Sequence, residues 1–407
     1  MRDRALRAIA ACRHIATFTE EPGRITRRFL TPPTHDAHTY LHARMEALGM
    51  TVRVDAAGNL RGQWRPAGAN RKRLLLGSHI DTVPDAGAFD GILGVTLALE
   101  CVDLAREISL PLALDVIAFS EEEGVRFGVP FLGSRAIAGR FDAALLALND
   151  AAGATLKDAI HAYGLDPTQL SSATESEDAV GFVEIHIEQG PVLEAENLSV
   201  AAVTGIVGQT RLTVGFTGQA NHAGTTPMHL RRDALAGSAE WINAVEKHAK
   251  ITDGLVATVG KINASPNAGN VIAGSVLLSL DVRHSHDAIR LAAVDQLINA
   301  ANAIAERRGL AMQCTRQMDQ PAVPMDERLT AYLVDAIEIA GLPEKRMSSG
   351  AGHDAMVMAA RMPTSMLFLR SPGGISHNPA EGVREEDVEA ALHVMRAFLE
   401  RFAGGIR

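Results

Sequence analysis

Five side chains in four short stretches of the sequence are of the types that bind divalent metal ions. They are three imidazoles and two carboxylates, from His79, Asp90, Glu123, His186 and His377. Nitrogen and oxygen ligands of this kind suit Zn, Mn, Co or Ni. Two such ions held a few ångströms apart polarise a carbonyl group and ionise a water molecule, which is hydrolytic chemistry. The sequence therefore predicts a two-metal hydrolase.

Neighbouring residues support this interpretation, although a single histidine or aspartate near a strand end is usually structural. Asp81 follows His79 by two residues, on the same side of an extended segment, and is placed to orient its imidazole. Asp90 has two carboxylate oxygens and is able to bridge two ions. The acidic run 121–123 is open to interpretation as a solvated turn, but carboxylates at the end of a buried strand need a counter-charge. One glutamate then binds a metal while its neighbour acts as a base.

The first half of the chain alternates strand and helix patterns. Apolar runs predict buried strands at 73–78, 112–119 and 182–187, and a helical pattern covers 92–105. Such alternation predicts an α/β fold with a mixed, mainly parallel sheet flanked by helices. Three of the metal-binding stretches begin at or near strand ends, and open α/β sheets place their sites at the carboxyl ends of strands.

The pattern changes near Gly208. Segments 211–216 and 276–282 alternate apolar and polar residues, which is typical of half-solvated strands. We therefore expect an inserted, smaller α+β domain at residues 208–318. The remainder, 1–207 and 319–407, is then a discontinuous catalytic domain, since His377 follows a late strand. The other elements expected are helices at 287–307, 327–340 and 385–402 and a strand at 364–369.

Composition excludes several classes of protein. The 407 residues carry a net charge of -9, which argues against nucleic acid as a partner. No apolar stretch is long enough to span a bilayer, and the first residues lack the apolar core of a signal peptide. Cys12, Cys101 and Cys314 are isolated thiols, which fit a reducing compartment. We expect a cytoplasmic protein with no membrane partner.

Longer runs of sequence resemble a known family. Segments 184–194, 221–228, 270–272, 281–284 and 350–354 are similar to the metal-dependent amidohydrolases of N-carbamoyl compounds. These belong to the aminoacylase and carboxypeptidase superfamily, and they include N-carbamoyl-L-amino-acid hydrolases and allantoate amidohydrolases. The resemblance extends from about Gly58 to Glu381 and so covers both expected domains.

The resemblance implies a role for each candidate in the catalytic domain. His79, Asp90 and His186 would hold one metal ion. Asp90, Glu123 and His377 would hold the other, with Asp90 as the bridge. Glu122 would be the general base that activates the attacking water, and Asp81 would orient His79. Two divalent ions per subunit are therefore the expected cofactors.

The resemblance also implies a set of substrate-binding residues. Arg283 would clamp a substrate carboxylate, which the planar guanidinium does better than a lysine. His222 would act as a second catalytic residue by stabilising the oxyanion. Asn270 would bind substrate with them, and Gln189 would do so from the catalytic domain. The smaller domain would be a lid and dimerisation domain of a homodimer that lends His222 and Asn270 to the neighbouring subunit.

The expected reaction is hydrolysis of the ureido C–N bond of a small anionic substrate, with release of ammonia and carbon dioxide. Segment 26–33 differs from many carbamoylases and is similar to sequences called allantoate amidohydrolases, which favours allantoate over an N-carbamoyl-L-amino acid. Arg370 stands where many relatives carry proline. The alternatives are a peptidase or N-acyl amino acid hydrolase of the same superfamily, and a non-catalytic binding protein. We interpret His38 and His42 as part of a solvated helix face.

Overall fold

The computed structural model describes residues 1–69 and 71–405. The chain divides into two compact units. One is formed by Met1–Thr204 together with the chain from Met325 onward, and the other by Gly205–Pro324. Among the described residues, no helix combines the length and the apolar character needed to cross a membrane.

The predicted inserted domain ends earlier than the observed unit. Strand β13 (Ala311–Gln320) pairs with β7 (Gly208–Thr217) as far as Gln320, beyond an irregularity between Arg316 and Met318. A short strand, β14 (Val323–Pro324), then follows. The end predicted at residue 318 thus falls within β13.

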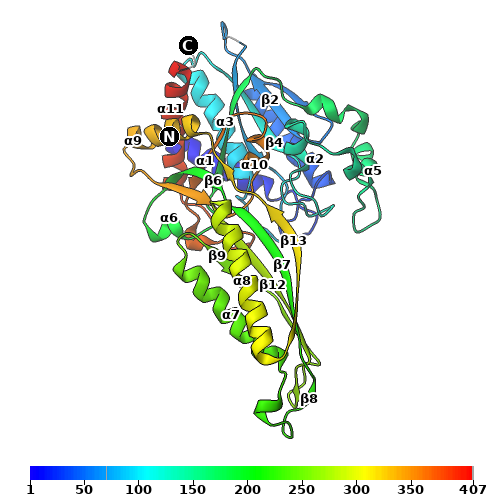
Figure 1. The fold of residues 1–407 in the computed structure, drawn as a ribbon. Coiled ribbons are helices and arrows are strands. Elements are labelled where there is room, and N and C mark those ends of the chain that lie inside the picture. The colour runs from blue at the N-terminus through cyan, green and yellow to red at the C-terminus, as the bar shows by residue number, and fades with distance from the viewer. Residues whose placement is uncertain (70, 406–407) are drawn as a thin grey trace. The chain divides into compact units, whose positions relative to one another are not determined.

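The larger unit contains a sheet with helices around it (Figure 1), and the central strands of this sheet are parallel. These strands of the sheet follow one another in the order β1 (Thr51–Val54), β2 (Leu60–Trp64), β4 (Ala113–Phe119), β3 (Arg73–His79), β5 (Ala179–Ile187), β16 (Thr364–Leu369) and β6 (Val200–Ile206). Strand β15 (Arg346–Ser349) also pairs with β6. The pairs β4–β3, β3–β5 and β5–β16 are parallel, whereas β1–β2, β2–β4 and β16–β6 are antiparallel. The predicted α/β class with a mainly parallel sheet is confirmed.

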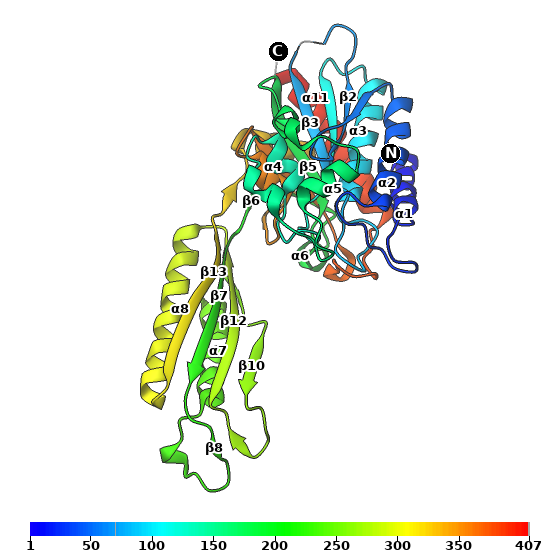
Figure 2. The same cartoon turned by 90° about the vertical axis from the view of Figure 1, so that its right-hand side faces the viewer.

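Several helices of the larger unit, α3 (Ile92–Glu107) among them, pack on this sheet. The larger unit has nine α-helices among the described residues. They are α1 (Arg2–Ile15), α2 (Pro32–Ala47), α3 (Ile92–Glu107), α4 (Leu132–Ile137), α5 (Leu156–Ala162), α6 (Val192–Ala195), α9 (Glu327–Ile339), α10 (Asp354–Met358) and α11 (Glu385–Gly405). Every residue of β3 and β4 is buried, as a parallel sheet covered on both faces requires. Figure 2 shows β3 and β5 between α3 on one side and α4 on the other.

Two local expectations differ from the structure. Helix α11 runs past the predicted end at Phe402. Phe402 is buried, and its ring centroid lies 5.7 Å from that of Tyr332, so this part of the helix packs on the core. The solvated helix face expected at His38 is wrong, since His38 is only 5% exposed. Its side chain is covered by Tyr163, a residue distant in sequence, and helical spacing alone gives no sign of such a contact.

The smaller unit is an antiparallel sheet with two long helices, α7 (Ala234–Ile251) and α8 (Asp287–Arg308) (Figure 2). Its strands run in the order β10 (Ile262–Ser265), β12 (Ser275–His284), β7, β13, and β9 (Val256–Thr258) also pairs with β12. Burial alternates along β12, so one face of the sheet packs into the core with Trp241 while Leu277 is exposed. Strands β8 (Asn221–His222) and β11 (Val271–Ile272) form a separate pair.

Candidate metal site

The predicted metal ligands lie at the carboxyl ends of neighbouring parallel strands. His79 is the last residue of β3, and His186 is close to the end of β5. Glu123 comes shortly after β4, and His377 lies in the loop after β16. Because β4, β3, β5 and β16 are adjacent and parallel, these ends meet at one edge of the sheet. Asp90 reaches the same edge from the loop between β3 and α3.

Asp90 lies between two groups of these ligands. Its Oδ1 is 3.2 Å from Nε2 of His186 and 3.7 Å from Nε2 of His79. Its Oδ2 is 3.2 Å from Nε2 of His377, and that nitrogen is 3.5 Å from Oε1 of Glu123. Within each group, one ligand atom per residue lies within 4.8 Å of the others. The structure thus brings the five residues together as two sets that share Asp90.

The hydrogen bonds of two imidazoles leave their other nitrogens facing Asp90. Nδ1 of His186 is 2.8 Å from the carbonyl oxygen of Ile187, and Nδ1 of His79 is 3.1 Å from that of Asp81, so each Nδ1–H donates outward. Their Nε2 atoms, 3.4 Å apart, then present lone pairs to each other. Oδ1 of Asp90 is buried with no hydrogen-bond partner among the described residues. This convergence of lone pairs on a carboxylate oxygen fits a divalent cation.

Asp81 connects the first imidazole to the acidic run after β4. Its Oδ1 is 3.4 Å from Nδ1 of His79. The backbone N–H groups of Glu122 and Glu123 donate to its two oxygens, each at 3.0 Å. A single buried carboxylate therefore fixes the backbone that carries both glutamates and lies against the His79 ring.

Burial controls the charge of the glutamates. It raises the pKa of Glu122 well above its usual value and the pKa of Glu123 to about 7. A divalent cation beside the two glutamates would lower their pKa values.

Gln189, predicted to bind substrate, lies at this ligand cluster. Its backbone has a φ of 57°, in the left-handed region that few residues other than glycine adopt. Its backbone N–H donates to Oγ of Ser371 at 3.0 Å. Its Nε2 is 3.1 Å from Oδ2 of Asp90 and 3.3 Å from Oγ of Ser376. The turn thus directs the amide towards the ligand that the two groups share.

Sequence reasoning missed two residues that support Asp90. Oε1 of Glu381 accepts the backbone N–H groups of Phe89 at 2.9 Å and of Asp90 at 3.1 Å. Its Oε2 accepts the hydroxyl of Ser376 at 3.1 Å. Glu381 is buried. The available signal was its position four residues after His377.

His353 is a further neighbour of the site. Its ring centroid is 4.5 Å from that of His186, and its Nε2 is 2.8 Å from Oγ of Ser349. Burial lowers the pKa of His353 well below its usual value, so the ring is neutral. With Glu184 and His186 it forms another group whose ligand atoms lie close together. The sequence identifies His353 only by its place in a matching segment.

The three substrate residues predicted in the smaller unit are not all brought together within it. His222 and Asn270 are neighbours, because the N–H of Ala223 donates to the carbonyl of Asn270 at 2.9 Å. Arg283 lies near the end of β12, whereas Asn270 precedes the start of that strand. At about 3.3 Å per residue, Arg283 is roughly 25 Å along the strand from its first residue, Ser275. Its guanidinium donates to both oxygens of Asp281, at 2.9 and 3.1 Å.

Comparison with known proteins gives one family and closely related chains. Residues 75–401 match the model of peptidase family M20/M25/M40. An allantoate amidohydrolase of Escherichia coli is 38% identical over 394 residues, which cover 96% of this chain and 96% of that protein. An N-carbamoyl-L-amino-acid amidohydrolase of Paenarthrobacter aurescens is 36% identical and covers 95% of this chain and 96% of its own.

A solved structure gives the same result for the fold. An amidase of the hydantoinase/carbamoylase family from Burkholderia multivorans superposes with a TM-score of 0.92 at 32% identity. The match covers 98% of this chain and 97% of that one.

Proposed function

The chain belongs to peptidase family M20/M25/M40, and from this premise we propose that it is a metal-dependent amidohydrolase of ureido acids. It adds one water to the ureido C–N bond of a small carboxylate-bearing substrate and releases ammonia, carbon dioxide and the amine. The observation that carries this proposal is similarity over nearly the whole chain to proteins named for that reaction. A peptidase or N-acyl amino acid hydrolase is not favoured, since the relatives compared act on carbon–nitrogen bonds other than peptide bonds.

Two divalent cations are held by the sets that share Asp90. His79, Asp90 and His186 bind one, while Asp90, Glu123 and His377 bind the other. The inward-facing imidazole nitrogens and the unpartnered Asp90 oxygen support this assignment. When bound, such ions polarise the substrate carbonyl and acidify water. Ligands of these types accept Zn, Mn, Co or Ni.

Glu122 is the general base. It takes a proton from the attacking water and returns it to the departing nitrogen. Its place in one close group with His79 and Glu123 supports this role, as does the fixing of its backbone by Asp81. Burial keeps bulk water from competing for that proton.

The substrate is held by residues of both units. Gln189 contacts it from the ligand cluster, and Arg283 binds its carboxylate through a planar pair of hydrogen bonds. His222 stabilises the oxyanion and Asn270 binds alongside it. The length of β12 between Arg283 and the His222–Asn270 pair supports a homodimer, in which that pair completes the active site of the partner subunit.

Allantoate is the first candidate substrate, and an N-carbamoyl-L-amino acid is the second. The preference rests on segment 26–33, which lies against the loop after β3. The side chain of Arg27 donates to the carbonyl of Ile80 at 2.6 Å, and its N–H donates to Oγ1 of Thr82 at 2.9 Å. A change of sequence in this segment would therefore alter the surroundings of His79 and Asp81. Three free thiols, two of them buried, support a cytoplasmic location.

The test is ammonia release by the full chain reconstituted with Mn²⁺, with a chelated sample as control. Allantoate and a panel of N-carbamoyl-L-amino acids are supplied in turn, followed by dipeptides and N-acetyl amino acids. Chelator-sensitive release of ammonia is expected from allantoate first. Preference for a carbamoyl amino acid would correct the substrate, and cleavage of peptides or acetyl amino acids alone would overturn the proposal.

A further inference from the structure

The two proposed ion sites share Asp90 but take their other ligands from different parts of the chain. The His186 set consists of His79, Asp90 and His186, and the His377 set consists of Asp90, Glu123 and His377. Asp90 lies in the loop between β3 and α3, and His377 lies in the loop between β16 and α11. Glu381 belongs to the same loop as His377 and is only 7% exposed. These two loops meet at Glu381.

Both oxygens of the Glu381 carboxylate are hydrogen-bonded. Its Oε1 accepts the backbone N–H groups of Phe89 at 2.9 Å and of Asp90 at 3.1 Å. Oγ of Ser376 lies 3.1 Å from Oε2 of Glu381 and 3.1 Å from Oδ2 of Asp90. That Asp90 oxygen is the one 3.2 Å from Nε2 of His377. The carboxylate therefore joins the backbone of the shared ligand to the residue directly before His377.

The loop of Asp90 also packs closely against this carboxylate at Gly87. A Cβ atom at this position would lie 2.3 Å from Cβ and Oε1 of Glu381 and 2.4 Å from its Cδ. Unbonded carbon atoms do not approach one another so closely. The φ of Gly87 is not positive, so it is the close approach that requires a glycine here. An alanine at this position would displace the Glu381 side chain.

The ligands of the His186 set are held by other bonds. The N–H of Ile92 donates to the carbonyl of Asp90 at 2.7 Å, and that of Leu93 donates to the carbonyl of Phe89 at 3.0 Å. The first turn of α3 thus holds the backbone of the shared ligand. The two imidazoles of this set lie on strands and are oriented by carbonyl groups one or two residues away. This set does not need Glu381 to form.

The position of His377 depends more on its loop. Its backbone φ is 55°, in the left-handed region, where a residue with a side chain is strained and must be held by its surroundings. Glu194 holds the loop on either side of His377, since it accepts the N–H of Gly373 at 2.6 Å and pairs with Arg384 at 2.7 Å. Between these two points, Glu381 supplies the bonds to the backbone of the Asp90 loop.

We propose that Glu381 is a positioning residue for one of the two ions. It holds the loop of His377 against the loop of Asp90, so that the His377 set forms a complete site. The His186 set binds its ion without this contact. The inference rests on the two-ion site of the proposed function.

The test counts the Mn²⁺ ions bound by the full chain, by isothermal titration calorimetry on protein freed of metal by chelator. Two ions are expected for the unsubstituted chain. Glu381→Ala should bind the first ion with unchanged affinity and the second about 10- to 100-fold more weakly. Electron paramagnetic resonance should show spin coupling between neighbouring Mn²⁺ ions only in the unsubstituted chain. Glu386→Ala, at an exposed glutamate of the next helix, is the control and should bind two ions.

A conservative variant separates positioning from direct ligation by Glu381. Glu381→Gln keeps an oxygen for the two backbone N–H groups, and its amide N–H₂ is able to donate to Oγ of Ser376. It should therefore bind the second ion almost as the unsubstituted chain does. A loss equal to that of Glu381→Ala would overturn the positioning role.

A pair of glycine variants covers the case in which Glu381→Ala does not fold. Gly87→Ala should weaken the second ion as Glu381→Ala does, whereas Gly382→Ala should not, because a Cβ there meets nothing within 4 Å. Full affinity for both ions in Glu381→Ala or Gly87→Ala, or loss of both ions together, would overturn this inference alone. Fewer than two ions in the unsubstituted chain would contradict the proposed two-ion site as well.

Discussion

Three consecutive glutamates after β4 have different surroundings and therefore different chemistry. The backbone N–H groups of Glu122 and Glu123 donate to Asp81, and both side chains belong to a close group with His79. Glu121 belongs to no such group, and burial raises its pKa well above the usual value. The triplet is thus not a simple acidic turn, because each member has its own environment.

This contrast gives a prediction with a matched control. Glu122→Gln is expected to reduce turnover about 10²- to 10⁴-fold, since the amide is unable to accept the proton of water. Metal content, measured by mass spectrometry, should not change. Glu121→Gln changes a carboxyl group outside the cluster with His79, and a far smaller loss of turnover is expected. Comparable losses in both variants would remove Glu122 as the base.

Arg283 gives a second residue-scale prediction. A charge-assisted bond to a carboxylate contributes about 1.5–3 kcal/mol, so Arg283→Ala should raise KM roughly 10- to 150-fold. Arg211 also donates to Asp281, at 2.9 Å, and is the natural control. Arg211→Ala should alter KM little, because Arg211 contacts Asp281 as Arg283 does but is not proposed to bind the substrate. Steady-state kinetics on allantoate distinguish these outcomes, and equal KM values would exclude the clamp.

At the scale of elements, the loop that carries His377 is anchored by a buried ion pair. Arg370, directly after β16, donates to both oxygens of Asp387 at 2.8 and 2.5 Å, and both side chains are almost fully buried. Asp387 belongs to the first turn of α11. Arg370 therefore ties the end of a central strand to the C-terminal helix.

Breaking this pair should be costly. Asp387→Asn leaves the guanidinium buried without its counter-charge, and the free energy of unfolding should fall by about 3–5 kcal/mol. Urea denaturation of the metal-free chain measures the loss. Glu194→Gln, which breaks the half-exposed pair with Arg384, should cost about 1 kcal/mol or less. If both variants lost a similar amount of unfolding free energy, the Arg370–Asp387 pair would contribute no more than an exposed pair.

A second buried network predicts a pH dependence of stability. Burial alone would raise the pKa of Glu175, but the guanidinium groups of Arg61 and Arg73 outweigh it and hold the pKa below its ordinary 4.5. A carboxylate whose pKa is lower in the folded than in the unfolded protein stabilises the fold. This stabilisation is fully present above the unfolded-state pKa and is lost as pH falls through the folded-state pKa.

The corresponding experiment compares the unsubstituted chain with Glu175→Gln by urea denaturation from pH 7 to pH 3, with chelator throughout. The difference in unfolding free energy should be about 3–5 kcal/mol at pH 7 and should shrink below about pH 4.5. Glu177→Gln, at an exposed carboxylate two residues away, is the control. A difference that stays constant with pH would contradict the assigned sign.

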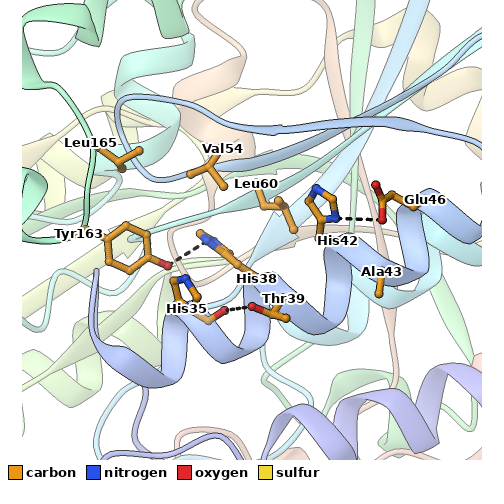
Figure 3. Close-up of a pocket in the computed structure, with 10 residues that line it drawn as sticks. All are labelled: His35, His38, Thr39, His42, Ala43, Glu46, Val54, Leu60, Tyr163 and Leu165. Atoms are coloured by element: carbon orange, nitrogen blue, oxygen red, sulfur yellow. Dashed lines mark hydrogen bonds and ion pairs between the residues drawn. The ribbon is translucent and has the colours of Figure 1, made fainter.

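At the scale of the whole molecule, the close approach of the proposed metal ligands could be predicted from the sequence. Most of them lie at or after the ends of parallel strands, and these ends meet at one edge of the sheet. Glu381 could not, because its role depends on the fold of a loop that returns to the N–H of Asp90. The burial of His38 could not be predicted either, because it comes from Tyr163, far along the chain (Figure 3). Local patterns identify elements, whereas contacts between loops need the assembled fold.

Metal removal should affect the two units differently. The five proposed ligands all belong to the larger unit, so binding of ions stabilises that unit by mass action. Hydrogen exchange of the full chain, with Mn²⁺ and with chelator, should show lost protection around His79, Asp90, His186 and His377. Residues 208–320 should exchange at the same rate in both samples. Uniform loss of protection across the chain would contradict this assignment.

The position of β16 has a consequence for synthesis of the protein. This strand lies between β5 and β6, yet it is made long after both. At about 5–20 residues per second, the roughly 160 residues from β6 to β16 need about 8 to 30 s of translation. Throughout that interval the nascent chain has two unpaired strand edges in the middle of its future sheet, which are exposed to mispairing. We expect productive folding to depend on protection of these edges at the ribosome until residues 364–369 emerge.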